Sequence, residues 1–299
     1  MSRKKMMLLA NKAAFFTLLL LAVFCLATPA NAAVHKHGEN NSQLGSWSKY
    51  PMLMPVGGGR GNKTVSLINS QADTVTVFSA VSTKKEASPP YWNSTKTAKG
   101  FVITPKNSIG GYHWVMARHE SAELVEVATS IVYFSMPAPP PTEMLNRVKN
   151  RLEIIPQPMP REHAHYRAGE SWPFLIRFHG KPLAAQTVNF ISEQGESLSF
   201  TSNTNGIAEI TFPKEFKTQT EAKVEGKKMR HGHTRPKANF ILTTTYLVDG
   251  KRYQTTFNND YRPGPFFNKS LATGFGFMFL GVILATPLLR KPKKNRGQA

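Results

Sequence analysis

The chain has 299 residues, of which 38 are Lys or Arg and 18 are Asp or Glu, so its formal net charge is +20. Its single cysteine excludes a disulfide framework within the chain and any metal site built from several thiolates. The length allows one large or two ordinary domains in addition to targeting segments.

Residues 1–32 have the pattern of a secretory signal peptide. A basic stretch comes first, with Arg3, Lys4, Lys5 and Lys12. The apolar run Ala13–Ala27 follows, and the segment ends in Ala30-Asn31-Ala32, whose small residues suit cleavage. We therefore expect export and a cut after Ala32. Because Cys25 lies in this segment, the mature chain would contain no cysteine.

The expected mature chain begins Ala33-Val34-His35, and His37 follows two residues later. A free amine, two backbone amides and an imidazole at position three can form the square-planar site that Cu(II) and Ni(II) prefer. The alternative is an N-terminal tail that happens to carry these histidines, because a shift of one residue in the cleavage site would destroy the motif.

Residues 33–136 are expected to form an N-terminal β domain. They contain short runs rich in Val, Ile, Thr, Phe and Tyr, separated by Gly, Asn and Pro, which is a strand pattern. The predicted strands are Thr64–Asn69, Thr74–Val81, Gly100–Ile103, Gly111–Met116 and Leu124–Phe134. Two histidines, His113 and His119, flank the end of the fourth strand and are candidates for additional metal ligands.

Four of the five residues 137–141 are proline, a density that excludes a helix interior and a central strand. We therefore expect residues 137–150 to be a stiff, extended linker. It would separate the N-terminal domain from a C-terminal domain that comprises residues 151–260.

The C-terminal domain shows the same strand-rich pattern. Its predicted strands are Leu152–Ile155, Trp172–Phe178, Gln186–Ile191, Ser197–Thr201, Ile207–Phe212, Phe240–Val248 and Tyr253–Asn258. Asn205-Gly206 and Asp249-Gly250 tolerate positive φ and predict two tight hairpins. This number of strands is typical of an immunoglobulin-like or transthyretin-like sandwich. The expected fold class is all-β, with two β-sandwich domains and one C-terminal transmembrane helix.

A cluster of metal-binding residue types lies near the start of this domain, at Glu162, His163 and His165. Side chains at i and i+2 of a strand point to the same side, so the two imidazoles would converge. Imidazoles with a carboxylate are a common ligand set for Ni, Co, Cu or Zn. The alternative is an exposed edge strand in which Glu162 pairs with Arg161 or Arg167.

A third His-x-His pair, His231 and His233, lies within residues 217–239. This stretch is basic and has no apolar period, so we expect a long surface loop. Its Lys and Arg side chains would repel a metal cation. An alternative interpretation is that the loop contacts an acidic partner or a membrane surface.

Leu271–Leu289 is a run of 19 residues without charge, close to the length that spans a bilayer as a helix. The tail, residues 290–299, carries five Lys or Arg, and the positive-inside rule places it in the cytoplasm. Without the cations of the signal and the tail, 29 Lys and Arg face 18 Asp and Glu, so the exported part carries +11. An exported domain of this charge is expected to face anionic lipid or an acidic partner, and no nucleic acid. The alternative is a solvated basic surface without a specific partner.

Several motifs of the C-terminal domain carry a family resemblance. They are Leu152-Glu153-Ile154 with Pro156, Gly169-Glu170, Trp172–Phe178, Gly180–Leu183 and Thr204-Asn205-Gly206. From Leu152 to about Phe212 the chain resembles a bacterial periplasmic family of uncharacterised function, often labelled the periplasmic component of cobalt/nickel transport. The resemblance implies a sandwich domain, an anchor in the inner membrane and metal handling beside an importer. A histidine just after signal cleavage is typical of the family and is matched by His35 and His37.

We therefore expect a membrane-anchored periplasmic protein that binds a divalent transition metal through its His-x-His pairs and assists its uptake or handling. Ni or Co is favoured, Cu and Zn are left open, and a metal-import transporter is the expected partner. The alternative is an anchored adaptor that uses its basic loop and binds no metal. No enzyme is expected, because the HExxH, GxSxG and P-loop motifs are absent and no catalytic triad is evident.

Overall fold

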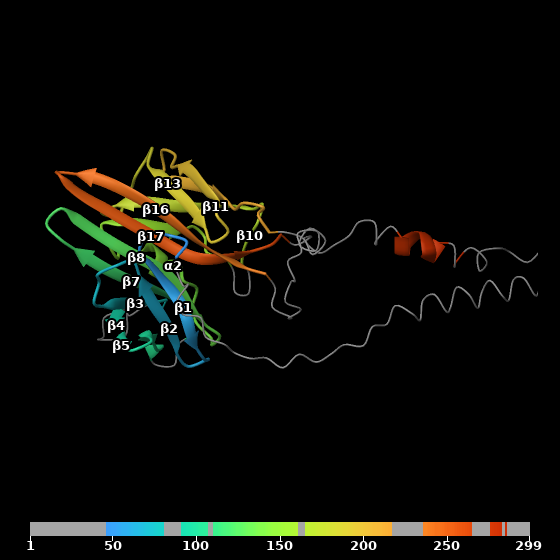
Figure 1. The fold of residues 1–299 in the computed structure, drawn as a ribbon, viewed down its shortest axis with the longest axis horizontal. Coiled ribbons are helices and arrows are strands. Elements are labelled where there is room, and N and C mark those ends of the chain that lie inside the picture. Colours follow the sequence, from blue (N-terminus) through green and yellow to red (C-terminus); the bar gives the residue numbers. More distant parts are fainter. Residues whose placement is uncertain are drawn as a thin grey trace, which may run out of the picture. The chain divides into compact units, whose positions relative to one another are not determined.

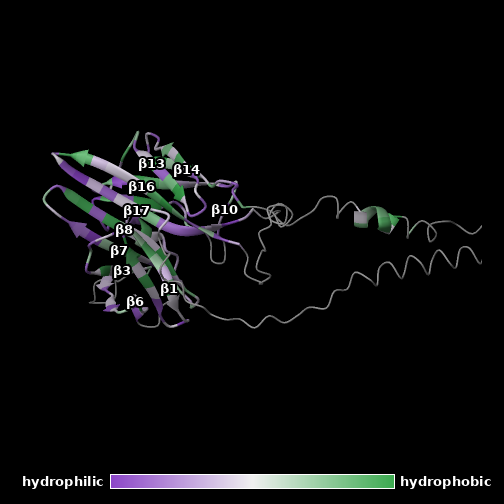
Figure 2. Cartoon of the chain, in the orientation of Figure 1, coloured by the Kyte–Doolittle hydropathy of each residue, from purple (hydrophilic) through white to green (hydrophobic). Residues whose placement is uncertain are grey.

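The computed structural model of the chain describes residues 46–80, 91–106, 110–160, 165–216, 236–264, 276–282 and 285. Strands dominate these ranges, which confirms the all-β prediction (Figure 1). Hydrophobic and hydrophilic residues alternate along the long strands (Figure 2). Because successive side chains of a strand point to opposite faces, this alternation lets one face of each strand be buried.

The described residues before the proline-rich segment form eight strands. These are β1 (Met52–Gly58), β2 (Lys63–Ile68), β3 (Val75–Ser79), β4 (Tyr91–Asn93), β5 (Thr95–Thr97), β6 (Gly100–Ile103), β7 (Gly111–Glu120) and β8 (Leu124–Phe134). The five strands predicted for this part correspond to β2, β3, β6, β7 and β8. The sequence did not predict β1, β4 or β5, which are short or contain proline and glycine.

The described residues after Pro141 form one short helix and nine strands. These are α2 (Thr142–Asn146), β9 (Leu152–Pro156), β10 (Tyr166–Arg167), β11 (Ser171–Phe178), β12 (Lys181–Pro182), β13 (Thr187–Ser192), β14 (Ser197–Thr201), β15 (Ile207–Thr211), β16 (Ala238–Val248) and β17 (Lys251–Arg262). All seven predicted strands are present. The helix α2 lies in residues 137–150, which were expected to form an extended linker. The segment folds into a helical turn there, and the burial of Met144 and Leu145 stabilises this turn.

The strands form three sheets. The central sheet has the order β14-β13-β16-β17-β8-β7-β3-β4, with β10 also paired to β17. A second sheet has the order β1-β2-β6-β5, and a third has β9, β12 and β15 paired to β11. In the central sheet, β8 and β17 run parallel and side by side (Figure 1). Strands from both sides of the proline-rich segment therefore belong to one sheet.

The smaller sheets cover opposite faces of the central sheet. Along β7, Trp114 and Met116 belong to the core formed with β9, β11 and β15. The alternate residues Val115 and Ala117 belong to a different core, formed with β1, β2 and β6. Since alternate residues of a strand point to opposite faces, the two cores lie on opposite sides of the sheet. Each large side chain buried in them contributes about 1.5–3 kcal/mol.

The junction between β8 and β17 is polar although it is buried. The hydroxyls of Thr129 and Ser130 donate to the carbonyls of Thr256 and Asn258, at 2.6 and 2.8 Å. The Asn258 amide also holds β1, because it accepts from the Leu53 N–H at 2.9 Å and donates to the Leu53 carbonyl at 2.8 Å. A buried polar group without a partner costs about 1–3 kcal/mol, so these pairs favour one register of the three strands.

Of the two predicted hairpins, one is confirmed. Asp249 and Gly250, with φ of 50° and 71°, join β16 to β17 with Val248 opposite Lys251. The prediction at Asn205-Gly206 is wrong: the turn forms, but β14 pairs with β13 and β15 pairs with β11. Turn residues specify a chain reversal, whereas burial of each strand's apolar face selects its neighbours. This turn therefore carries the chain from the central sheet to the third sheet.

Three charged residues, Lys149, Glu153 and Arg177, form a buried ion cluster beneath α2. Their side chains are at most 6% exposed. The Arg177 Nε donates to Glu153 Oε2 at 2.8 Å, and Lys149 Nζ lies 3.5 Å from Glu153 Oε1. Both cations also donate to the Arg147 carbonyl, each at 2.7 Å. Carbonyls at a helix C-terminus favour cations, which offsets the second positive charge.

Near the C-terminus, Gly276–Val282 is helical. Among the described residues, no helix is long and apolar enough to cross a membrane. Most of the predicted span 271–289, together with the signal peptide and the tail 290–299, lies outside the described residues. The transmembrane helix therefore stays a prediction.

Replacing Glu153 tests the buried ion cluster. Glu153→Gln would leave Lys149 and Arg177 buried without a counter-charge, so the free energy of unfolding should fall by about 3–5 kcal/mol. Urea denaturation followed by tryptophan fluorescence measures this change. The control is Glu209→Gln on the exposed face of β15, which should change stability by less than about 0.5 kcal/mol. Equal effects of the two variants would contradict the assignment.

Lys149 should also give stability a distinct pH dependence. Burial lowers the pKa of Lys149 to about 8, from 10.5. Between these values the unfolded chain binds the proton and the native chain does not, so the free energy of unfolding rises with pH. Relative to Lys149→Met, the wild-type protein should gain up to about 1.4 kcal/mol per pH unit in this window. Parallel pH profiles of the two proteins would contradict this expectation.

Candidate functional site

The central sheet opens into a fork at one end. β8 and β17 pair from Leu124 opposite Arg252 to Ser130 opposite Asn258. Beyond this point β17 pairs with β10, with Tyr166 opposite Tyr261. Since β16 occupies the other edge of β17 there, β10 takes the side that β8 occupied earlier. The two parallel strands therefore separate at their carboxyl ends, and other groups can enter between them.

A cavity of about 450 Å³ lies at this separation, which we call the fork cavity. Its polar lining residues are Lys63, Tyr112, Tyr133, Ser135, His165, Tyr166, Lys237, Asn259 and Asp260. Its apolar lining includes residues of β1, β2 and β8. The lining therefore combines residues that lie far apart in the sequence, and its volume is that of a small-molecule site.

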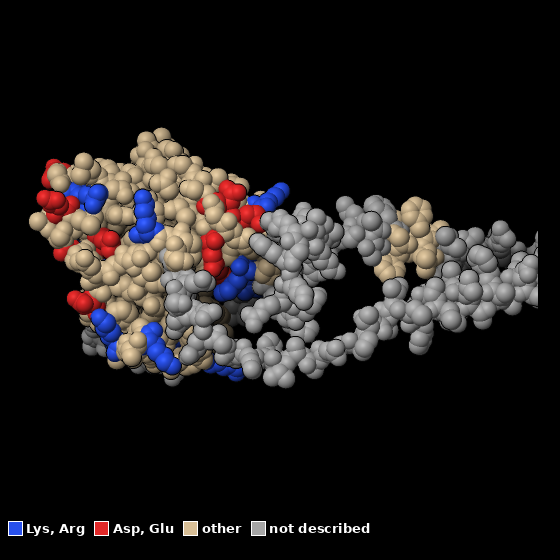
Figure 3. Space-filling view, viewed as in Figure 1, with Lys and Arg blue, Asp and Glu red and all other residues tan. Residues whose placement is uncertain are grey.

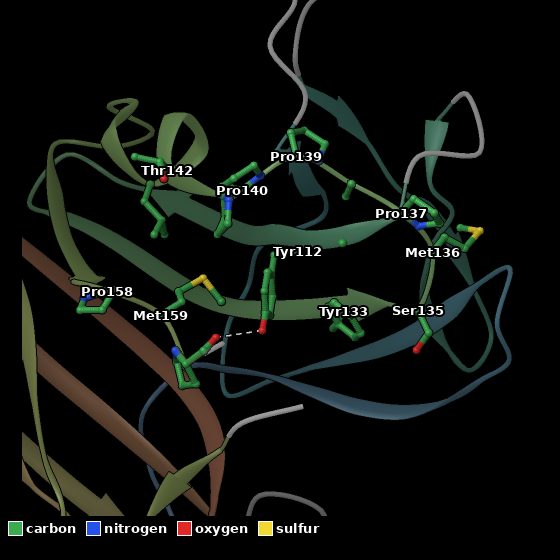
Figure 4. A pocket seen from close by; sticks show the side chains of 15 residues that line it. Tyr112, Tyr133, Ser135, Met136, Pro137, Pro139, Pro140, Thr142, Pro158 and Met159 are labelled. Carbon is green, nitrogen blue, oxygen red and sulfur yellow. Dashed lines mark hydrogen bonds between the residues drawn. The ribbon is translucent and has the colours of Figure 1, made fainter. Parts of the chain in front are cut away.

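A larger apolar groove of about 820 Å³ adjoins the fork cavity (Figure 4). Prolines 137 and 139–141 line one part of it, and Pro158 and Met159 line another. Tyr112 and Tyr133, with ring centroids 4.9 Å apart, line both spaces. The Tyr112 hydroxyl donates to the Pro160 carbonyl at 2.9 Å, shown as a dashed line in Figure 4. This bond ties the segment that leads toward His165 to the central sheet.

His165 and Asp260 are brought together by the pairing of β10 with β17. His165 directly precedes Tyr166, and Asp260 directly precedes Tyr261, its opposite residue in the parallel register. Both also line the fork cavity. Neighbouring strands lie about 4.8 Å apart, so an imidazole and a carboxylate on adjacent strands can act on the same ligand. This pair of residue types can coordinate a divalent transition metal.

The charges around this pair are mixed. The buried Oδ2 of Asp260 has no hydrogen-bond partner in the described ranges, and the Arg262 Nε lies 3.9 Å from it. A buried carboxylate oxygen that is incompletely satisfied is a group that a bound ligand can satisfy. Lys63 and Lys237 bring two positive charges to the same cavity.

His113 belongs to the core and does not line the fork cavity. Its side chain is fully buried, with ring centroids 5.8 Å from Trp92 and 5.0 Å from Phe134. Its Nδ1 lies 3.4 Å from the Gly111 carbonyl, and its Nε2 has no partner among the described residues. Burial lowers the pKa of His113, against a smaller raising effect of the Gly111 carbonyl. The surroundings therefore favour the neutral imidazole.

The other candidate residues lie elsewhere. His119 is half-buried on β7 opposite Glu126, six residues along the strand from His113. At about 3.3 Å per residue these two histidines are about 20 Å apart and cannot share one ion. The candidates Glu162, His163, His35, His37, His231 and His233 lie outside the described residues. Within the described ranges, no group of three His, Cys, Asp or Glu side chains could hold a metal ion.

The sequence pointed to His165 but missed the residues that surround it. Asp260 and Lys237 lie 95 and 72 residues farther along the chain, and Lys63 lies about 100 residues before it. The only local signal was the run of three polar residues Asn258–Asp260 after Phe257, which interrupts the alternation of the strand. Which residues face His165 depends on the register of β10, a strand of two residues that no periodicity can reveal.

The sequence matches no known family model, and no curated protein is significantly similar to it. The similarity of residues 152–212 to periplasmic proteins labelled with cobalt/nickel transport therefore stays a prediction.

Replacing His113 distinguishes a core histidine from a metal ligand. Its lowered pKa means that the unfolded chain binds a proton more readily than the native protein does. The stabilising effect of the neutral ring is thus present above about pH 6.5 and is lost as the pH falls below it. Relative to His113→Phe, the wild-type protein should lose up to about 1.4 kcal/mol of unfolding free energy per pH unit below 6.5. Identical urea denaturation profiles from pH 5 to 7.5 would contradict this.

Proposed function

We propose that the protein is an exported, membrane-anchored protein that binds a divalent transition metal in the fork cavity and assists its uptake or handling. The observation that carries the proposal is the placement of His165 and Asp260 one residue before an opposed pair on adjacent parallel strands. An imidazole and a carboxylate provide two of the ligands that such a metal needs.

The remaining ligands would come from the segment just before His165. Glu162 and His163, which lie outside the described residues, are three and two positions before His165 in the chain. The resemblance to proteins labelled with cobalt/nickel transport favours Ni(II) or Co(II), and an importer in the inner membrane as the partner. On this proposal, His35 and His37 capture or pass on the ion.

A second candidate function is an adaptor that binds an acidic partner. Its support is the presence of Lys63 and Lys237 in the fork cavity, since Lys237 belongs to the basic stretch 217–239. On the face shown in Figure 3, acidic and basic side chains are scattered and leave broad uncharged areas. The cations of the described surface seen there therefore do not form one patch, and the lysines of the cavity are the ones that favour this function.

Metal titration of the full chain, exported with its native N-terminus and purified in detergent, tests the main proposal. Calorimetry with the chlorides of Ni(II), Co(II), Cu(II) and Zn(II), with bound ions counted by elemental mass spectrometry, should show stoichiometric binding. His165→Ala and Asp260→Asn should each weaken it at least about tenfold, which is about 1.4 kcal/mol. The matched control is His119→Ala, which removes an imidazole far from the cavity.

Three results would contradict the proposal. The first is binding weaker than about millimolar, roughly 4 kcal/mol, for all four ions. The second is binding that survives both cavity variants and is lost only when His35 is replaced, which would restrict the function to the N-terminus. The third is an equal loss in His119→Ala and His165→Ala.

A further inference from the structure

The charge of the fork cavity does not suit a bare metal cation. Lys63 comes from the start of β2, and Lys237 directly precedes β16, so the two lysines that line the cavity belong to different sheets. Within the described part of the chain, neither lysine has an ion-pair partner. A divalent ion bound beside His165 would therefore experience repulsion from two nearby positive charges.

The single carboxylate in this lining compensates little of that charge. Asp260 is already 3.9 Å from the Arg262 guanidinium, so part of its negative charge is balanced within the protein. The cavity therefore has an excess of positive charge before any metal enters. A ligand that carries its own negative charge would relieve the excess, because ammonium groups bind carboxylates by charge-assisted hydrogen bonds.

The volume of the cavity also favours a ligand larger than a hydrated metal ion. At about 450 Å³ it lies within the range of sites that enclose organic molecules, about 300–1,000 Å³. Six water molecules, the shell of a hydrated ion, occupy only about 180 Å³ at about 30 Å³ each. The cavity thus has room for an ion together with a small chelating molecule.

We propose that the fork cavity takes its metal as a complex with a small polycarboxylate chelator. His165 replaces one water of the metal, and Lys63 and Lys237 bind carboxylate oxygens of the chelator that face away from the ion. This inference rests on the proposed function, because it names the form in which the metal arrives. It assigns to the two lysines a role that a site for a hydrated ion would not need.

Competition between two forms of one metal tests the inference. The full chain is titrated with nickel(II) chloride in a non-coordinating buffer and with a one-to-one nickel(II)–citrate complex. Retention of radiolabelled citrate is measured by equilibrium dialysis with and without nickel. The complex should bind at least tenfold more tightly than the chloride, and citrate should be retained only when nickel is present.

The lysines provide the discriminating variants. Lys63→Gln with Lys237→Gln should remove the tenfold advantage of the complex and strengthen binding of nickel(II) chloride, because the repulsion of the bare cation is lost. The matched control is Lys99→Gln with Lys181→Gln, two exposed lysines outside the cavity, which should leave the advantage in place.

Each failure has a separate meaning. Equal binding of chloride and complex, both weakened by His165→Ala, would overturn the chelator inference and keep the metal function. An unchanged advantage in the lysine double variant would also overturn the inference. Binding of neither form, or binding that ignores His165→Ala, would overturn the proposed function itself. Citrate retained equally well without nickel would overturn the chelator inference, since the cavity would then bind the organic anion independently of the metal.

Discussion

Seven residue pairs join β8 to β17 in parallel, and the architecture on both sides depends on this ladder. Without it, the strands before and after the proline-rich segment would form separate sheets with two more open edges. Parallel strands need a long crossover. Here the connection between β8 and β17 has more than a hundred residues and includes the third sheet, formed by β9, β11, β12 and β15. The buried hydroxyls of Thr129 and Ser130 donate to the carbonyls of Thr256 and Asn258 across the junction, and the side-chain amide of Asn258 donates to the Leu53 carbonyl of β1. Through Asn258 the ladder between β8 and β17 also holds β1, which belongs to the second sheet.

The fork cavity follows from the place where this ladder ends. β8 continues toward β7 and the proline-rich segment, whereas β17 continues beside β16 and gains β10 as a neighbour. Two parallel strands that part at their carboxyl ends leave a crevice between them, as they do at the switch points of open parallel sheets. The resemblance is one of geometry alone. It explains why residues from β2, β8, β17 and the segment before β10 converge at this position.

The period-two pattern of β-branched and aromatic residues was enough to predict twelve of the seventeen described strands, and the hairpin at Asp249-Gly250 was predictable from its two turn residues. Pairing was harder, because it is decided by burial between segments that are distant in sequence. The turn at Asn205-Gly206 shows this, since local chemistry forms the turn while its strands enter different sheets. The residues of the candidate site likewise fall into those that the sequence indicated and those that only tertiary pairing reveals. His165 was visible as part of a motif, but Asp260 and Lys63 become its neighbours only through tertiary pairing.

Two groups of cationic side chains in this protein differ in whether the fold supplies acceptors for them. Lys149 and Arg177 are buried, and the carboxylate of Glu153 and the carbonyls at the C-terminal end of α2 accept nearly all of their donors. These hydrogen bonds hold α2 against β11, so few donors of Lys149 and Arg177 are available to a ligand. Lys63 and Lys237 lie at a cavity and have no such acceptors in the described ranges. Lys63 and Lys237 line the same cavity as His165 and Asp260, so on the proposed function this cavity would recognise an anion and a metal together.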